Sequence, residues 1–180
     1  MKNLKGTKTE KNLLAAFAGE SQAKKEGYEQ IAALFEETAD NEKEHAKVFF
    51  KHLQGGDAEI IATYPSGIIG TTEQNLLAAA EGEKMEWGTL YPDFAETAEK
   101  EGFPEVALSF RNIAKVESYH EKRYRKLLEN VKNKKVFKKD NVVKWKCRNC
   151  GYVHEGNEPP KMCPACKHPQ SYYELWMENY

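Results

Sequence analysis

The 180-residue sequence has no apolar run of about eighteen residues, the length that suggests a membrane-spanning helix. Its first ten residues also lack the apolar core of a secretory signal. Basic residues (27 Lys plus Arg) and acidic residues (28 Asp plus Glu) nearly cancel to a net charge of −1, which gives no sign of a nucleic-acid or membrane-binding surface. We therefore expect a cytoplasmic protein that binds neither nucleic acid nor membrane.

Cysteine is also scarce, because the chain has only four, and all lie in the last quarter as two Cys-x-x-Cys pairs. Each pair lets two sulfurs on a tight turn reach one ion, and two pairs close a tetrahedral shell that suits iron or zinc. Disulfides are the weaker interpretation, because every cysteine has metal-type spacing. The expected ligands are Cys147, Cys150, Cys163 and Cys166.

Aromatic residues gather around this site, and a proline follows Cys163. An apolar shell excludes water and helps to set a reduction potential, so this composition favours a small iron electron carrier. A structural zinc ribbon that mediates interactions is the alternative, and it predicts a colourless, zinc-containing protein. The aromatic residues are Trp145, Tyr152, Tyr173 and Trp176.

The rest of the chain has a helical pattern. Apolar residues recur every three or four positions over residues 9–54, with a break at Gly27 and a stop at Gly55-Gly56. Residues 55–71 carry too many glycines and prolines for a helix, and they are long enough for a crossover connection between helices.

Two further helices are expected after this connection. The first is capped by Thr72 and runs to about Lys100, and Pro92 should kink it or disturb its hydrogen bonds. A turn at residues 102–104 leads into the second, which ends near Lys132. We therefore predict a mainly α protein with a four-helix bundle over residues 1–133, a linker over 134–144 and a small metal-bound β domain over 145–180.

The two halves of the helical part repeat each other. An Asn-Leu-Leu-Ala-Ala and Gly-Glu pattern at residues 12–20 recurs at 75–83, an offset of 63. A Glu-x-x-His pair at residues 42–45 recurs at 117–120, an offset of 75. The first repeat is therefore shorter than the second by about three helical turns.

Carboxylates and histidines recur with these repeats. Residues three apart lie on one helix face, so Glu-x-x-His can offer a carboxylate and an imidazole to one site. A single such pair usually consists of solvent-exposed side chains on a helix surface. Here the pair occurs twice, in register with the internal repeat, which favours a metal site. Several carboxylates with histidine are the ligands that iron prefers. The candidate ligands are Glu20, Glu42, His45, Glu83, Glu86, Glu117 and His120.

These motifs closely resemble those of rubrerythrins, in the same order and over essentially the whole chain. The matching segments are Ala18-Gly-Glu-Ser-Gln-Ala23, Glu42-Lys-Glu-His-Ala46, Gly82-Glu83-x-x-Glu86, Glu117-x-x-His120, Cys147-x-x-Cys150-Gly-Tyr-Val and Cys163-Pro-x-Cys166. The resemblance implies a ferritin-like bundle with a di-iron centre, fused to a rubredoxin-like domain with one iron that zinc can replace.

The resemblance also implies an activity, the reduction of hydrogen peroxide to water in oxidative-stress defence. Electrons are expected from NAD(P)H through a separate reductase or a rubredoxin, entering at the rubredoxin-like iron. A homodimer is expected, in which one subunit's rubredoxin-like centre lies near the other's di-iron site. The alternative is a ferroxidase or iron-handling protein, which shares the bundle ligands but has no use for an attached electron carrier.

Carried over by position, the resemblance implies one role for each bundle ligand. Glu42 and Glu117 bridge the irons, Glu20 and Glu86 bind one iron, and Glu83 and His120 bind the other. His45 is the redox-linked alternative to Glu86, and Tyr91 matches a tyrosine just outside the ligands. Glu86, His45 and Tyr91 are therefore the expected catalytic residues.

One departure from the family concerns the first helical hairpin. The resemblance implies about eleven more residues between Ala23 and Lys24, close to three helical turns. Glu20 lies seven residues before Gly27 and Glu42 fifteen after it, so a simple hairpin leaves their heights different by roughly 12 Å. Three explanations are open: the printed sequence omits a segment, the first two helices fuse and swap between subunits, or the Glu20 ligand is lost.

Overall fold

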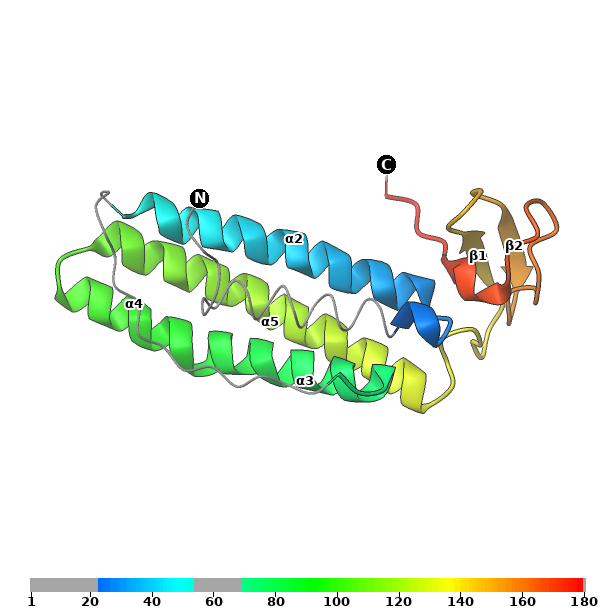
Figure 1. Cartoon of the computed structure of the whole chain (residues 1–180), viewed down its shortest axis with the longest axis horizontal. Coiled ribbons are helices and arrows are strands. Elements are labelled where there is room, and N and C mark those ends of the chain that lie inside the picture. The colour runs from blue at the N-terminus through cyan, green and yellow to red at the C-terminus, as the bar shows by residue number, and fades with distance from the viewer. Residues whose placement is uncertain (1–22, 54–68, 180) are drawn as a thin grey trace.

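A computed structural model describes residues 23–53 and 69–179, in which long helices are followed by a small β domain at one end (Figure 1). The helices are α2 (Glu29–Lys51), α3 (Thr72–Met85), the π-helix η1 (Glu86–Leu90), α4 (Tyr91–Lys100) and α5 (Pro104–Lys132). The small domain contains β1 (Val143–Cys147), β2 (Val153–Gly156), the 3-10 helix η2 (Gln170–Tyr172) and β3 (Tyr173–Leu175). This order confirms the predicted mainly α fold with a C-terminal β domain.

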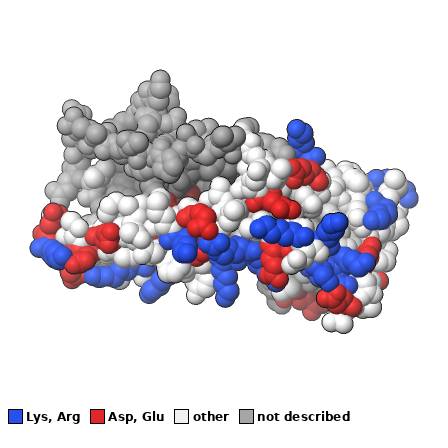
Figure 2. Space-filling model, turned by 90° about the horizontal axis from the view of Figure 1, so that it is seen from below, with Lys and Arg blue, Asp and Glu red and all other residues white. Residues whose placement is uncertain are grey.

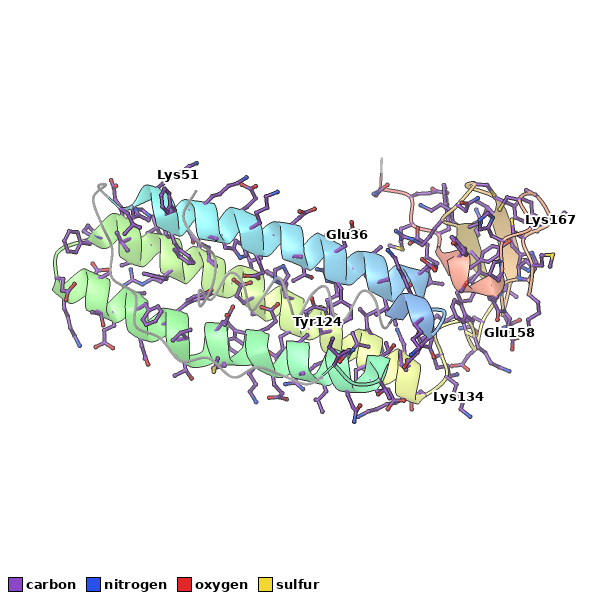
Figure 3. The ribbon with its side chains drawn as sticks, in the orientation of Figure 1. Glu36, Lys51, Tyr124, Lys134, Glu158 and Lys167 are labelled. Carbon is purple, nitrogen blue, oxygen red and sulfur yellow. The ribbon has the colours of Figure 1, made fainter. Side chains whose placement is uncertain are left out.

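Helix α5 forms the centre of the bundle, because it packs against α2, α3 and α4. Tyr124 and Leu128 of α5 join Phe35 of α2 and Leu76 of α3 in the largest apolar cluster of the described residues. The rings of Phe35 and Tyr124 lie 5.1 Å apart, and Figure 3 places Tyr124 part-way along the bundle. Each large apolar side chain buried here contributes roughly 1.5–3 kcal/mol by leaving water.

The two helical hairpins have the same turn, at Gly27 and Gly102. Both glycines adopt a left-handed conformation, with φ of +80° and +84°. In both, the N–H of the next residue donates to a carbonyl five residues earlier, at 2.8 Å. The chain therefore turns at Gly27, as the Gly27 break predicted, and the first two helices are not fused. A swap between subunits stays a prediction.

The disturbance predicted at Pro92 takes the form of the π-helix η1. The N–H of Tyr91 donates to the carbonyl of Glu86, five residues earlier rather than four. Pro92 has no N–H to continue an α-helical ladder. The wider turn just before it absorbs this gap and lets α4 continue.

Thr71, and not the predicted Thr72, caps α3. The Thr71 hydroxyl accepts the N–H of Gln74, and the Gln74 side chain accepts the N–H of Thr71. This reciprocal pair is a capping box, and its signal is the glutamine three residues after the first of the two threonines.

The small domain is a three-stranded antiparallel sheet in the order β2-β1-β3. Trp145 and Tyr173 are its largest buried side chains, and they pack with Cys147 and Cys163. The Trp145 ring N–H donates to the carbonyl of Gly156 at 2.9 Å, which joins β1 to the end of β2.

The small domain lies against the beginning of α2 (Figure 1). The Tyr28 ring stacks on Phe137 of the linker, with ring centres 6.1 Å apart. A side-chain carbon at Gly27 would lie 3.6 Å from Cβ of Ser171, so the hairpin turn also touches the domain. The turn at Gly27 therefore supports both the bundle and the domain junction.

Glu20, the first helix and most of the predicted connection at residues 55–71 lie outside the described residues. No helix in the part that the structure describes is long and apolar enough to cross a membrane. Figure 2 shows acidic and basic side chains intermingled along one face of the molecule.

Candidate metal centres

Three helices bring four of the predicted bundle ligands together. Their ligand atoms lie within 4.8 Å of one another, and all four side chains are buried. The residues are Glu42 from α2, Glu83 from α3, and Glu117 and His120 from α5. Because Glu-x-x-His occupies one helix face, α5 directs two ligands to the site at once.

Glu117 lies between two histidines and has no solvent exposure. One carboxylate oxygen lies 3.0 Å from Nδ1 of His45, and the other lies 3.0 Å from Nδ1 of His120. The two imidazole rings are 6.1 Å apart. A carboxylate that offers one oxygen to each side has the geometry of a bridging ligand.

His120 faces two further carboxylates through the same nitrogen. Its Nδ1 lies 3.4 Å from Glu83 and 3.6 Å from Glu42. His45 is less enclosed, and its Nδ1 lies 3.6 Å from Glu42. The cluster is therefore nearly symmetric about Glu42 and Glu117, and the predicted ligand His45 lies at its edge.

Glu86 is buried at the start of η1 and accepts a hydrogen bond from the Tyr91 hydroxyl at 3.3 Å. Burial, followed by the negative charge of Glu86, raises the pKa of Tyr91. The phenol therefore keeps its proton at neutral pH. The structure thus pairs two of the three predicted catalytic residues.

The pKa values show how the cluster distributes charge without metal. Burial would lower the pKa of both histidines, but nearby carboxylates raise it to about 9 for His45 and about 11 for His120. Burial would raise the pKa of Glu42, but the two imidazoles lower it to about 2. Burial raises the pKa of Glu83 to about 8. Two imidazolium groups therefore supply the positive charge that metal ions would otherwise bring.

The bundle residues fit a metal centre. Apart from the two imidazoles, no donor among the described residues reaches either carboxylate oxygen of Glu117, and one oxygen of Glu83 has no hydrogen-bond partner there. Buried carboxylates without donors are costly unless a cation compensates them. Several carboxylate oxygens with imidazole nitrogens are the donor set that iron favours.

The sequence did not predict the polar side chains behind these ligands. Nε2 of His120 lies 3.2 Å from the amide oxygen of Asn41. The Trp87 ring N–H donates to Glu121 at 2.7 Å, which links η1 to α5 beside His120. Asn41 directly precedes Glu42 and Glu121 directly follows His120, but no spacing rule marks a residue next to a ligand.

The four cysteines form two turns of the same shape. Gly151 and Lys167, which follow the second cysteine of each pair, both have positive φ, +80° and +63°. Each donates its N–H to the carbonyl of the first cysteine in its pair, at 2.8 and 2.9 Å. Glycine takes this conformation freely, so Lys167 is held in it by the turn.

The sulfur positions fit one tetrahedral ion. The Cys147 and Cys166 sulfurs lie 3.7 Å apart, as do those of Cys150 and Cys163. A metal–sulfur bond of about 2.3 Å requires sulfurs about 3.8 Å apart on a tetrahedron.

Backbone N–H groups point at every cysteine sulfur, two at each buried cysteine and one at each of the others. The donation from His168 lowers the pKa of Cys166 to about 6. Such donors stabilise thiolate, the form that binds metal. Without metal, however, burial raises the pKa of Cys147, and the neighbouring thiols raise that of Cys150 against the donation from Tyr152, so the turns favour thiolate at Cys163 and Cys166.

This architecture, a helical bundle with a buried carboxylate and histidine cluster joined to a four-cysteine β domain, defines a ferritin-like protein fused to a rubredoxin-like one. Two family models match accordingly, Rubrerythrin over residues 11–128 and the rubrerythrin rubredoxin-like domain over residues 145–174. The chain belongs to the rubrerythrin family of oxidoreductases, which has a di-iron and a rubredoxin-like iron site.

Individual relatives support this family assignment. Rubrerythrin of Porphyromonas gingivalis is 58% identical, over 99% of this chain and 95% of that protein. Rubrerythrin-1 of Clostridium acetobutylicum is 56% identical over the full length of both. A solved structure of fully reduced, all-ferrous nigerythrin has a TM-score of 0.55 and 30% identity, and the match covers 93% of this chain and 81% of that one.

The comparisons also bear on the length of the chain. The match to Rubrerythrin-1 spans 196 positions, whereas this chain has 180 residues. The relative therefore has at least sixteen residues that the printed sequence lacks. The three explanations of the short first hairpin stay predictions, and Glu20 itself lies outside the described residues.

Proposed function

We propose that this protein reduces hydrogen peroxide to water at a di-iron centre in the bundle, with electrons entering through iron at the four cysteines. The observation that carries the proposal is the presence of both sites in one chain. The carboxylate cluster suits two-electron chemistry on a small oxidant. The cysteine site suits the one-electron supply that restores the irons.

Each ligand has a proposed role in this centre. Glu42 and Glu117 would be shared by the two irons, Glu83 and His120 would hold one of them, and Glu86 would hold the other. His45 would be the redox-linked alternative to Glu86, and Glu20 is the remaining proposed ligand. The edge position of His45 supports this exchange, because its imidazole is less enclosed than that of His120.

When bound, the two ferrous ions supply the two electrons that cleavage of the O–O bond requires. The balanced reaction consumes one peroxide, two electrons and two protons and yields two water molecules. The Tyr91 hydroxyl donates to Glu86, so it lies where it can pass a proton to the site. The carboxylates of Glu86 and Glu117 are themselves buried away from bulk water.

The electron route is proposed to cross between subunits. The small domain contacts the chain at Gly27 and Tyr28, whereas Glu42 lies fourteen residues further along α2. At about 1.5 Å per residue this separation is roughly 21 Å, a long path for direct electron transfer within one chain. A homodimer in which the partner's cysteine site approaches the bundle shortens it. The electron donor is proposed to be a separate reductase or rubredoxin in the cytoplasm.

Stopped-flow mixing of the fully reduced protein with one equivalent of hydrogen peroxide tests this function. We expect rapid oxidation of the bundle irons, then oxidation of the cysteine-bound iron, without oxygen release. Reaction with dioxygen under the same conditions should be much slower. Accumulation of ferric mineral without peroxide consumption would instead support an iron-handling ferroxidase.

A further inference from the structure

His120 presents its two ring nitrogens to two different environments. Nδ1 faces the carboxylates of Glu42, Glu83 and Glu117 at 3.0–3.6 Å. Nε2 lies 3.2 Å from the side-chain oxygen of Asn41 on α2. One nitrogen is therefore directed to the metal cluster and the other to a neutral amide.

An amide oxygen can only accept a hydrogen bond, so Nε2 carries a proton in this contact, both in the imidazolium and in the neutral ring that would bind metal. The lone pair of a neutral imidazole is then on Nδ1, where a metal ion can take it. A hydrogen bond at the remote nitrogen also fixes the plane of the ring and raises the basicity of the ligating nitrogen.

The internal repeat shows that only one of the two motif histidines has an asparagine at the supporting position. An offset of 75 relates His45 to His120, and it relates Asn41 to Val116. The residue that corresponds to Asn41 therefore has an apolar side chain, which offers His45 no hydrogen bond. The two histidines share the Glu-x-x-His motif, but they differ in whether this position can accept a hydrogen bond from the imidazole ring.

The α2 segment that carries Asn41 is itself tied to α5. Arg123, one turn after His120, donates to the Thr38 hydroxyl at 2.7 Å and also pairs with Glu37. Thr38 lies one turn before Asn41. These contacts join α2 to α5 one turn away from Asn41.

We propose that Asn41 is a positioning residue that holds His120 as a fixed Nδ1 ligand, whereas Val116, at the equivalent position, gives His45 no such hydrogen bond. The proposal rests on the metal centre of the proposed function but not on its peroxide chemistry. Metal binding therefore tests it separately.

Cobalt(II) titration of Asn41→Leu and Asn41→Asp is the first measurement. Carboxylate and imidazole binding of cobalt is followed by its weak d–d absorption, which is distinct from the intense sulfur-to-cobalt bands of the cysteine site. Asn41→Leu keeps the volume but removes the acceptor, and it should weaken bundle cobalt binding about 10–100-fold. Asn41→Asp keeps an acceptor and should bind cobalt at least as tightly as the unchanged chain.

Thr38→Val is the matched control, because it breaks the neighbouring contact with Arg123 and leaves the imidazole of His120 untouched. A purely structural role for Asn41 predicts equal loss in both variants. The midpoint potential of the bundle irons gives a second readout. It should rise in Asn41→Leu, fall in Asn41→Asp and stay unchanged in Thr38→Val.

Unchanged cobalt affinity in Asn41→Leu would overturn the proposal, as would equal losses in Asn41→Leu and Thr38→Val. Failure of the unaltered protein to bind cobalt in the bundle would instead overturn the metal centre of the proposed function. The two failures are therefore distinguishable in one set of titrations.

Discussion

Glu117 is the carboxylate on which the bundle cluster depends most, because it is fully buried and touches both histidines. Its ligand role and its structural role can be separated in metal-free protein. Without metal, the two imidazolium groups need its negative charge, and removing one partner of a buried ion pair is strongly destabilising.

We expect Glu117→Gln to lower the free energy of unfolding of the metal-free protein by about 3 kcal/mol. Urea denaturation followed by far-UV circular dichroism measures this change. Glu129→Gln is the control, since Glu129 pairs with Lys126 in an exposed ion pair worth less than about 1 kcal/mol. Equal effects in the two variants would contradict the charge balance inferred for the cluster.

The pH dependence of the metal-free protein follows from the same groups. His45, His120 and Glu83 have folded-state pKa values of about 9, 11 and 8, above their ordinary values. The histidine contributions to stability are complete below about pH 6.5 and are lost as pH rises through the folded pKa. The Glu83 contribution declines between about pH 4.5 and 8. Glu42, with its pKa lowered to about 2, acts oppositely but only in acid.

The melting temperature of the metal-free protein should therefore fall by several degrees between pH 6 and pH 9. Metal binding displaces these protons, so the metal-loaded protein should show a flatter profile and should release protons on loading at pH 7. Thermal scans with and without metal measure both profiles. A metal-free melting temperature that rises over this range would contradict the inferred pKa directions.

At the level of helices, η1 shows how a local defect serves the site. Pro92 removes a backbone donor, and the π-turn that compensates for it begins at Glu86 and ends just before Tyr91. The wider turn brings these two residues into hydrogen-bond contact across five positions. The Trp87 contact with Glu121 then fixes this segment to α5.

A glycine in a hairpin turn and a glycine inside a helix allow a matched test of backbone strain. Gly27→Ala places a side chain at φ +80°, which costs roughly 1–2 kcal/mol even though the nearest neighbouring atom is at an ordinary distance of 3.6 Å. Gly82→Ala, inside α3 with open space around it, should instead stabilise by about 0.5–1 kcal/mol. Chemical denaturation of both variants checks the opposite signs. Stabilisation by Gly27→Ala would mean that the chain does not turn there.

At the scale of the whole molecule, the bundle and the cysteine domain have different sources of stability. The bundle buries its apolar side chains along three helical segments, whereas the small domain has a core of two aromatic residues and two cysteines. Domains below about 40 residues usually need metal, disulfides or a partner to fold. We therefore expect the small domain to need a bound metal ion in order to fold.

Cys163→Ser should unfold residues 143–175 and leave the helices intact. Loss of dispersed amide signals from the strands, with unchanged ellipticity at 222 nm, would show this. Ala165→Ser is the control, because it changes an exposed residue of the same turn without removing a ligand. A folded sheet in Cys163→Ser would mean that packing of Trp145 and Tyr173 suffices.

The sequence by itself determined the ligand types and much of the fold. Glu-x-x-His and Cys-x-x-Cys place their side chains through local backbone geometry, so spacing alone predicts them. Gly27 likewise predicted the turn between two helices, and Pro92 predicted the disturbed hydrogen bonding of its helix. Thr71 was missed by one residue, because two adjacent threonines satisfy the same pattern.

Only the tertiary structure decided which distant groups meet. Asn41 lies against His120, Trp87 against Glu121 and Tyr28 against Phe137. These contacts join residues on different segments, and their partners depend on helix rotation and packing rather than on any local period. The sequence therefore predicted the candidate metal ligands, and the packing of α2 against α5 decided that Asn41 lies against His120.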